Sequence, residues 1–161
     1  MDLTYADGMI LRAADIRRKE ESHSHPWNPA SEIHGARLAH DAGLRRIGVN
    51  IARIPPGKES FVYHRHHVEE EWLYILSGRA AIELDGTEHE VGPGDFVAFP
   101  PGVAHHVRNP FAEDVTYLMG GESVDVEIAD FPKLGKRMVR HGMKTAVYPL
   151  EAEALGAYPK L

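Results

Sequence analysis

The sequence lacks cysteine altogether, so neither a disulfide nor a thiolate metal site can form. It also lacks any apolar run near the ~20 residues that a membrane-spanning helix needs. No basic region followed by an apolar stretch opens the chain, so we expect no signal peptide and a cytoplasmic protein. Positive charge is scarce as well: 18 Lys and Arg stand against 24 Asp and Glu, a net charge of −6. This balance argues against nucleic acid or an anionic membrane as partner.

The overall composition of the chain is ordinary, but one residue type is unusually frequent. Its 161 residues, 43% hydrophobic and 26% charged, are typical of one soluble globular domain. Histidine is the exception, with eleven copies, several of them clustered. Clustered imidazoles in a chain without cysteine direct attention to a metal site built from nitrogen and oxygen donors.

From Leu44 onward, short apolar runs alternate with Gly and Pro turns, which is typical of an all-β sandwich or barrel. Asp85-Gly86, between two alternating runs, predicts a two-residue hairpin. The predicted strands are Arg45–Ile54, Ser60–His66, Glu71–Ser77, Arg79–Leu84, Thr87–Val91, Phe96–Phe99, His105–Arg108 and Val115–Met119.

Both ends of the chain show less pattern. Residues 1–43 predict an N-terminal arm with a short helix near Ala13–Glu21, and residues 44–120 the barrel itself. Residues 121–161 predict a tail that packs on the barrel or on a partner. We expect strands in this tail at Val124–Ala129 and Arg137–His141, and a short helix at Leu150–Leu155.

Four residues predict a metal centre. His64 and His66 lie two apart on a predicted strand, so both imidazoles leave the same face. Glu71 opens the next strand, and His105 opens a later one after a Pro-rich turn. Three imidazoles and one carboxylate suit a divalent transition ion (Fe, Mn, Ni, Co, Cu or Zn) rather than calcium or magnesium.

Two motifs give this part of the chain a clear resemblance to the cupin superfamily. The first reads His64-Arg-His66, four residues, Glu71, six residues, Gly78. The second reads Gly94, Pro100, Gly102, His105 and Asn109 with every spacing met. The resemblance covers about residues 44–120 and implies a single-domain double-stranded β-helix, a jelly-roll barrel. The tail that follows is similar to that of small bacterial cupins of undefined function.

The resemblance implies a metal bound by His64, His66, Glu71 and His105, but it does not choose a reaction. Cupins of this ligand type include oxygenases, decarboxylases and isomerases. Glu71 is a candidate catalytic group as well as a ligand. Two alternatives stay open: a vestigial site without metal, and a non-catalytic binding or sensing module whose metal fixes a ligand or stabilises the barrel. As further acids or bases in the lumen, Tyr117 and Asn50 are candidates by position.

Strand alternation also makes a prediction about assembly. If the ligands, Leu73 and Ile75 face the lumen, the intervening residues face outward. These are Phe61, Tyr63, Trp72, Tyr74 and Leu76. Such an apolar face would need cover from the arm or from a second subunit, and cupins commonly dimerise, so we expect a homodimer. His67 and His106 point away from the ligand face and are interpreted as structural.

Overall fold

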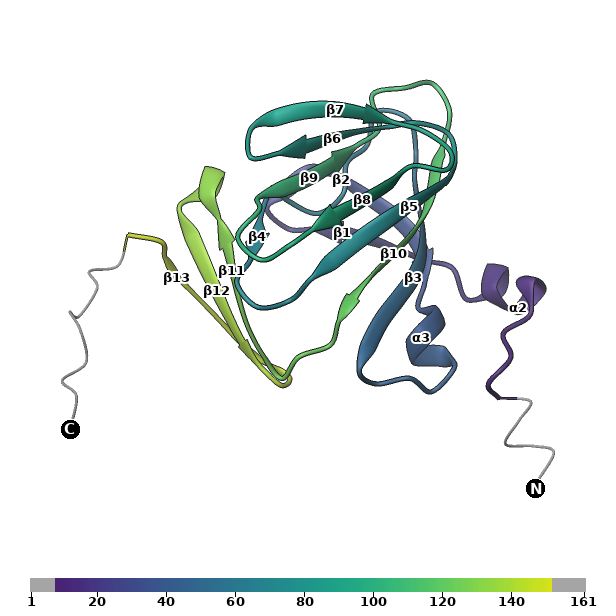
Figure 1. Ribbon diagram of the computed structural model, residues 1–161, viewed down its shortest axis with the longest axis horizontal. Helices are drawn as coiled ribbons and strands as arrows, with labels where there is room; N and C mark the ends of the chain where they lie inside the picture. The colour runs from purple at the N-terminus through teal and green to yellow at the C-terminus, as the bar shows by residue number, and fades with distance from the viewer. Residues whose placement is uncertain (1–7, 152–161) are drawn as a thin grey trace.

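The computed structural model describes residues 8–151, and β-strands dominate them because short β-branched and aromatic runs lie between tight turns (Figure 1). Ten of the thirteen strands coincide with predicted ones, although only Arg65–His66 of Ser60–His66 is regular strand. The helices are α2 (Ala13–Arg18), α3 (Leu38–Asp41) and the 3-10 helix η1 (Pro132–Leu134). The strands are β1 (Glu21–His25), β2 (Asn28–Ala36), β3 (Ile47–Ile54), β4 (Arg65–His66), β5 (Glu71–Ser77), β6 (Ala80–Leu84), β7 (Thr87–Val91), β8 (Phe96–Phe99), β9 (His105–Arg108), β10 (Val115–Glu122), β11 (Val126–Phe131), β12 (Lys136–His141) and β13 (Lys144–Pro149).

Three sheets build the barrel and its extension. The six-stranded sheet has the order β1-β2-β3-β10-β5-β8, and the three-stranded sheet has the order β7-β6-β9. Between these two sheets lies the main core, which includes Ile54, Leu73, Ile75 and Ile82. The four-stranded sheet β13-β12-β11-β4 projects from one side of the barrel (Figure 1). The predicted all-β jelly-roll barrel is confirmed.

The turn between β6 and β7 shows how local sequence sets register. Leu84 pairs with Thr87, so only Asp85 and Gly86 form the turn. Both have positive φ, 45° and 84°, as the type I′ turn requires. The predicted hairpin is therefore present.

The N-terminal segment holds two strands that the sequence analysis missed. β1 pairs with β2, and β2 adds to the barrel sheet beside β3. Along β2 the buried positions alternate at Ser31 and Ile33, with Gly35 next on that face. Only one of these three is a large apolar residue, so the alternation was too weak to identify a strand. The short helix predicted near Ala13–Glu21 is present as α2, but it ends earlier, at Arg18.

The C-terminal segment forms an antiparallel ribbon. β11 pairs with β4 on one side and with β12 on the other, and β12 pairs with β13. The sequence predicted β11 and β12 but did not predict β13. The predicted helix at Leu150–Leu155 extends beyond residue 151, outside the described residues. The division into arm, barrel and tail remains a prediction.

The predicted outward face needs a correction. Tyr63 is buried, and Phe61 borders the internal cavity although it is 37% exposed. Trp72 borders the cavity while it stacks on Phe96 of the outer face. Alternation fails at Phe61 and Tyr63 because the segment before Arg65 is not regular strand. Trp72 lies against Gly120 of the paired strand β10, where a Cβ would come within 2.6 Å of its ring.

Tyr74 and Leu76 do face outward. They are 39% and 42% exposed, and Phe96 on the neighbouring strand β8 is 61% exposed. Within residues 8–151, no helix is long and apolar enough to cross a membrane.

Candidate metal centre

The structure brings the four predicted ligands together from three parts of the barrel. His64 lies just before β4, His66 lies in β4, Glu71 is the first residue of β5, and His105 is the first residue of β9. His64 and His105 also form a backbone bridge, with N···O distances of 3.1 and 2.7 Å. This bridge holds two of the side chains at adjacent positions, 4.5 Å apart between ring centroids.

The donor atoms converge on one point. His64 Nε2 lies 3.1 Å from His66 Nε2, and Glu71 Oε2 lies 3.2 Å from His66 Nε2 and 3.3 Å from His105 Nε2. One donor atom of each residue lies within 4.8 Å of all the others. With metal–ligand bonds of about 2.1 Å, adjacent donors around one ion are about 3.0–3.4 Å apart. The spacing therefore fits a single ion held by all four side chains.

Two of the imidazoles are fixed in the tautomer that a ligand needs. His64 Nδ1 donates to the carbonyl of Val62 at 2.7 Å, and His105 Nδ1 donates to the carbonyl of Val103 at 3.1 Å. With the proton on Nδ1, each Nε2 presents a lone pair to the centre. The His105 ring also stacks on Phe99, with centroids 4.1 Å apart and an interplanar angle of 13°. Both ring orientations are thus set before any ion binds.

The electrostatics of the cluster favour neutral His64 and ionised Glu71. Burial, with the neighbouring imidazoles, lowers the pKa of His64 to about 3. Burial acts to raise the pKa of Glu71, but its contacts with His105 and His66 outweigh this and hold that pKa well below its usual range. A deprotonated carboxylate and neutral imidazoles are the forms that bind metal.

The outer ring nitrogen of His66 faces two more carboxylates. His66 Nδ1 is buried without a hydrogen-bond partner, and it lies 3.7 Å from both Glu69 Oε2 and Glu127 Oε1. Burial acts to lower the pKa of His66, yet Glu71 and these carboxylates together raise it. An Nδ1–H aimed at either carboxylate would direct Nε2 toward the centre. Neither Glu69 nor Glu127 was a candidate site residue from the sequence.

Glu127 of β11 organises the loop between the first ligands and Glu71. Its side chain is 1% exposed, and its two carboxylate oxygens accept the backbone N–H groups of His67, Val68 and Glu69 at 2.8–3.3 Å. Arg140 donates to Glu69 at 2.5 Å. The loop conformation therefore depends on the C-terminal ribbon, which lies far from it in sequence. No pattern in the sequence indicates this contact.

A second buried carboxylate supports the other face of β4. Asp130 is fully buried and accepts hydrogen bonds from Arg65, Arg137 and His67. The Arg137 guanidinium, then His67 and Arg65, hold the pKa of Asp130 well below its usual range against the opposing effect of burial. His67 thus has a structural contact, as predicted. Arg65 stands between the two ligands of its strand, so this cluster holds β4 in place.

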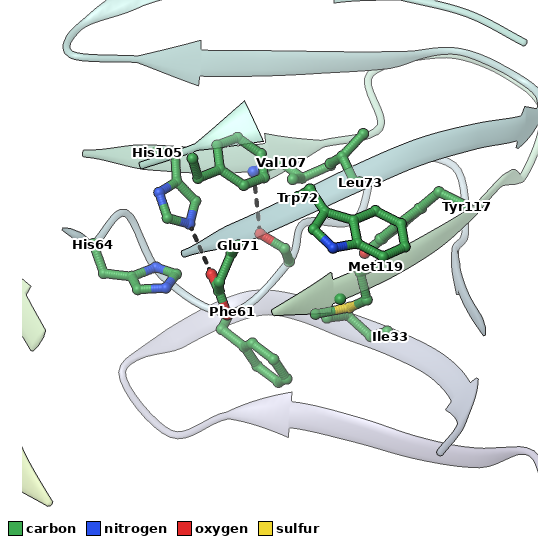
Figure 2. Close-up of a pocket in the computed structure, with 13 residues that line it drawn as sticks. Ile33, Phe61, His64, Glu71, Trp72, Leu73, His105, Val107, Tyr117 and Met119 are labelled. Atoms are coloured by element: carbon green, nitrogen blue, oxygen red, sulfur yellow. Dashed lines mark hydrogen bonds and ion pairs between the residues drawn. The ribbon is translucent and has the colours of Figure 1, made fainter. Parts of the chain in front are cut away.

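The centre lies at one end of an internal cavity of about 80 Å3 (Figure 2). Figure 2 shows His64, Glu71 and His105 pointing toward one another, with the apolar residues beyond them. Of the two further candidates, Tyr117 lines this cavity, and burial raises its pKa. Asn50 lines a neighbouring cavity instead. The apolar wall consists of Ile33, Phe61, Trp72, Leu73, Phe99, Val107 and Met119.

Comparison with known proteins adds the family. The sequence profile of the cupin domain matches residues 50–121, and a solved structure from Acidithiobacillus ferrooxidans is 32% identical with a TM-score of 0.90. That match covers 95% of this chain and 99% of the other. The chain belongs to the cupin family. The Acidithiobacillus cupin is provisionally named a sugar phosphate isomerase.

Three further proteins are similar to this chain over part or most of its length. A sugar phosphate isomerase from Silicibacter pomeroyi is 26% identical over 92% of this chain and 97% of its own, with a TM-score of 0.79. An uncharacterized protein of Methanocaldococcus jannaschii is 38% identical over 36% of this chain and 46% of its own length. Protein SchB of Streptomyces halstedii is 31% identical over 42% of this chain and 49% of its own length. The chain therefore spans about half the length of these two curated relatives.

Proposed function

We propose that His64, His66, Glu71 and His105 bind one divalent transition ion and that the protein is a metal-dependent enzyme acting on a small acidic molecule in the lumen. The observation that carries the proposal is the convergence of four donor atoms, at the spacing of a single coordination sphere, on one end of an internal cavity. Four protein ligands leave one or two positions of an octahedral ion for the molecule.

The bound ion would polarise a coordinated oxygen as a Lewis acid. The side chains around it have separable roles. Glu71 is a ligand that is 27% exposed, so it also reaches the molecule as a proton acceptor. Tyr117 keeps its proton because burial raises its pKa, and it therefore acts as a hydrogen-bond donor. The apolar wall excludes water from the remaining surface.

Charge and size point to a small acid. Three neutral imidazoles and one carboxylate leave a divalent site with a net charge near +1, which attracts an anionic oxygen. A cavity of about 80 Å3 has room for roughly six water-sized groups. None of the described residues that line it is Lys or Arg. A sugar phosphate, as the names of the two solved cupins suggest, would therefore find no Lys or Arg for its phosphate among these residues, and the metal ion would have to bind it.

The alternative is a non-catalytic cupin that binds or senses a small molecule. Its support is the shortage of proton-transfer groups: among the described lining residues, the ionisable side chains are the ligands and Tyr117. An absence of turnover together with metal-dependent binding would favour it.

The test is calorimetric titration of metal-loaded protein with small carboxylates, hydroxy acids, neutral sugars and sugar phosphates. We expect a carboxylate or hydroxy acid to bind, and its binding to be lost in apo protein and weakened in Glu71→Gln. Binding by neutral sugars alone, undiminished in apo protein, would overturn the proposal. A matched variant, Glu70→Gln, removes an exposed charge next to the ligand and should bind the acid as the parent does.

We also propose a homodimer through the outer face of β5 and β8. Trp72 and Phe96 stack there at 5.9 Å, and exposed Tyr74 and Leu76 continue the patch. β1 and β2 lie at the opposite edge of the same sheet, so they do not extend beyond β8. Phe96→Glu should convert a dimer to a monomer in light scattering. A monomeric parent protein at micromolar concentration would contradict the dimer without affecting the metal site.

A further inference from the structure

A second, larger cavity lies on the other side of β9 from the lumen. It is an open groove of about 510 Å3 between the outer face of β6, β7 and β9, the turn after β1, and η1. His105 and Val107 line the lumen, whereas His106 and Arg108 line the groove, as alternation along a strand requires. The groove shares no lining residue with the lumen, and no proposed metal ligand reaches it.

Most of the charges in the groove are paired. Lys133 lies 2.6 and 2.7 Å from the two carboxylate oxygens of Glu83, and Arg108 pairs with Glu88. Glu59 is different. Its Oε2 accepts a hydrogen bond from Asn28 at 2.9 Å, but among the described residues no Lys or Arg forms an ion pair with it. The carboxylate charge of Glu59 is therefore not compensated by a Lys or Arg among the described residues.

His106 places an unused acceptor next to that carboxylate. Its side chain is 8% exposed, and its Nε2 is buried without a hydrogen-bond partner. Burial lowers the pKa of His106, so the ring is neutral, and in the tautomer with the proton on Nδ1 its Nε2 carries a lone pair. It lies 3.6 Å from Glu59 Oε2, which is also an acceptor. A buried acceptor without a donor is unfavourable, so in this tautomer the two acceptors need a group with more than one N–H.

Two further features restrict the chemical groups that a ligand of this groove can carry. Arg108 Nε is a buried donor without a partner, on the same face of β9 as His106. A ligand that satisfies it must carry an acceptor oxygen. The groove also accommodates one ammonium group of the chain itself, since Lys133 Nζ lies 4.2 Å above the ring of Tyr63 while bound to Glu83. Carboxylates and aromatic faces are the surroundings that an ammonium ion prefers.

We propose that this groove is a second ligand site that binds a small molecule with a primary ammonium group and an adjacent oxygen acceptor, as in an α-amino acid or an amino alcohol. The ammonium group donates to Glu59 and His106, and the oxygen accepts from Arg108. The site requires no metal. Its existence is therefore independent of the reaction in the lumen.

The test is NMR titration of the full 15N-labelled chain with ethanolamine, and with ethylene glycol and acetate as probes that lack the amine. We expect ethanolamine to cause saturable shifts of the amide signals of His106, Val107 and Lys133, with a dissociation constant in the range of about 1–10 mM for so small a ligand. Ethylene glycol and acetate should leave these signals unchanged. This comparison needs no variant.

Two variants test whether the ammonium group contacts Glu59. Glu59→Gln keeps the size and the acceptor for Asn28 but removes the charge, so it should weaken ethanolamine binding about tenfold or more. Glu90→Gln is the matched control, because Glu90 pairs with Arg79 outside the groove and its loss should have no effect. The proposal is overturned if ethylene glycol or acetate shifts the same signals equally. It is also overturned if no saturable shift appears by about 100 mM ethanolamine, or if Glu59→Gln binds as the parent does.

Discussion

The two cavities on either side of β9 differ in nearly every physical property. The lumen is small and apolar apart from one end, and its polar side chains converge on a single point. The groove is about 510 Å3, open, and lined by charges that mostly cancel in pairs. Adjacent residues of one strand, His105 and His106, belong to different cavities. A histidine in this protein is therefore interpreted by the face it occupies, not by its neighbours in sequence.

The segment that contains β4 also presents different residues on its two faces. His64 and His66 face the metal centre, and Arg65 between them faces Asp130. One face serves the proposed chemistry, and the other attaches the strand to β11 and β12. The comparison suggests experiments in which the two faces are changed separately.

The largest effect is expected from the paired substitutions His105→Ala and His106→Ala. Elemental analysis of the parent protein should give about one transition ion per chain. Loss of the His105 ligand should lower metal affinity by at least about 100-fold, since even residues outside the coordination sphere change it 10–100-fold. His106→Ala should retain the ion, because its ring points into the groove. Full metal content in His105→Ala would refute the ligand assignment.

Asp130→Asn tests the supporting face of β4. Two arginines and a histidine lose a buried carboxylate charge, so the free energy of unfolding should fall by about 3 kcal/mol, measured by urea denaturation. Asp125→Asn, at an exposed position between β10 and β11, should change it little.

The pH dependence of this difference has a definite sign. Because the pKa of Asp130 is depressed in the folded protein, its contribution is fully present above the unfolded value of about 3.9. It is lost as the pH falls from there through the lower folded value. The two proteins should converge in stability below about pH 4. A constant difference down to pH 2 would show that the carboxylate charge is not the cause.

Metal removal should lower stability without unfolding the chain. An ion at a hundred times its dissociation constant adds about 2.7 kcal/mol, which corresponds to a shift of the melting temperature of order 5 °C. Calorimetry with and without a chelator measures this shift, and His105→Ala should show none. Since core residues such as Ile54, Ile75 and Ile82 lie outside the cavity that the ligands line, circular dichroism of the apo protein at 25 °C should remain that of a folded β-protein. A structureless apo protein would favour a structural metal over a catalytic one.

The smallest effect is expected from Glu127→Gln. The amide can no longer provide a charged acceptor near His66 Nδ1, so metal affinity should fall about tenfold in a chelator competition. Glu122→Gln, an exposed change at the end of β10, should leave the affinity unchanged. Equal affinity for all three proteins would mean that Glu127 supports the loop without orienting the ligand.

How far the site could be predicted depends on the range of the contacts. The ligands and their shared face follow from short spacings within strands, which a sequence displays directly. The strands from β5 to β10 follow equally, since each lies between identifiable turns. Glu127 and Asp130 act across about 60 residues, on partners in β4 and its loop. No local pattern distinguishes these two acidic residues from the exposed ones around them.

The sequence by itself determined the barrel, its hairpin turns and the four candidate ligands, because each depends on alternation and turn chemistry over a few residues. Tertiary structure alone decided which histidine faces which cavity, why Trp72 turns onto Gly120, and how the C-terminal ribbon holds the ligand loop. It also decided that Glu59 and His106 meet in a groove without a cation of their own. These features depend on which distant strands become neighbours, and that is set by packing of the whole core rather than by any segment of the chain.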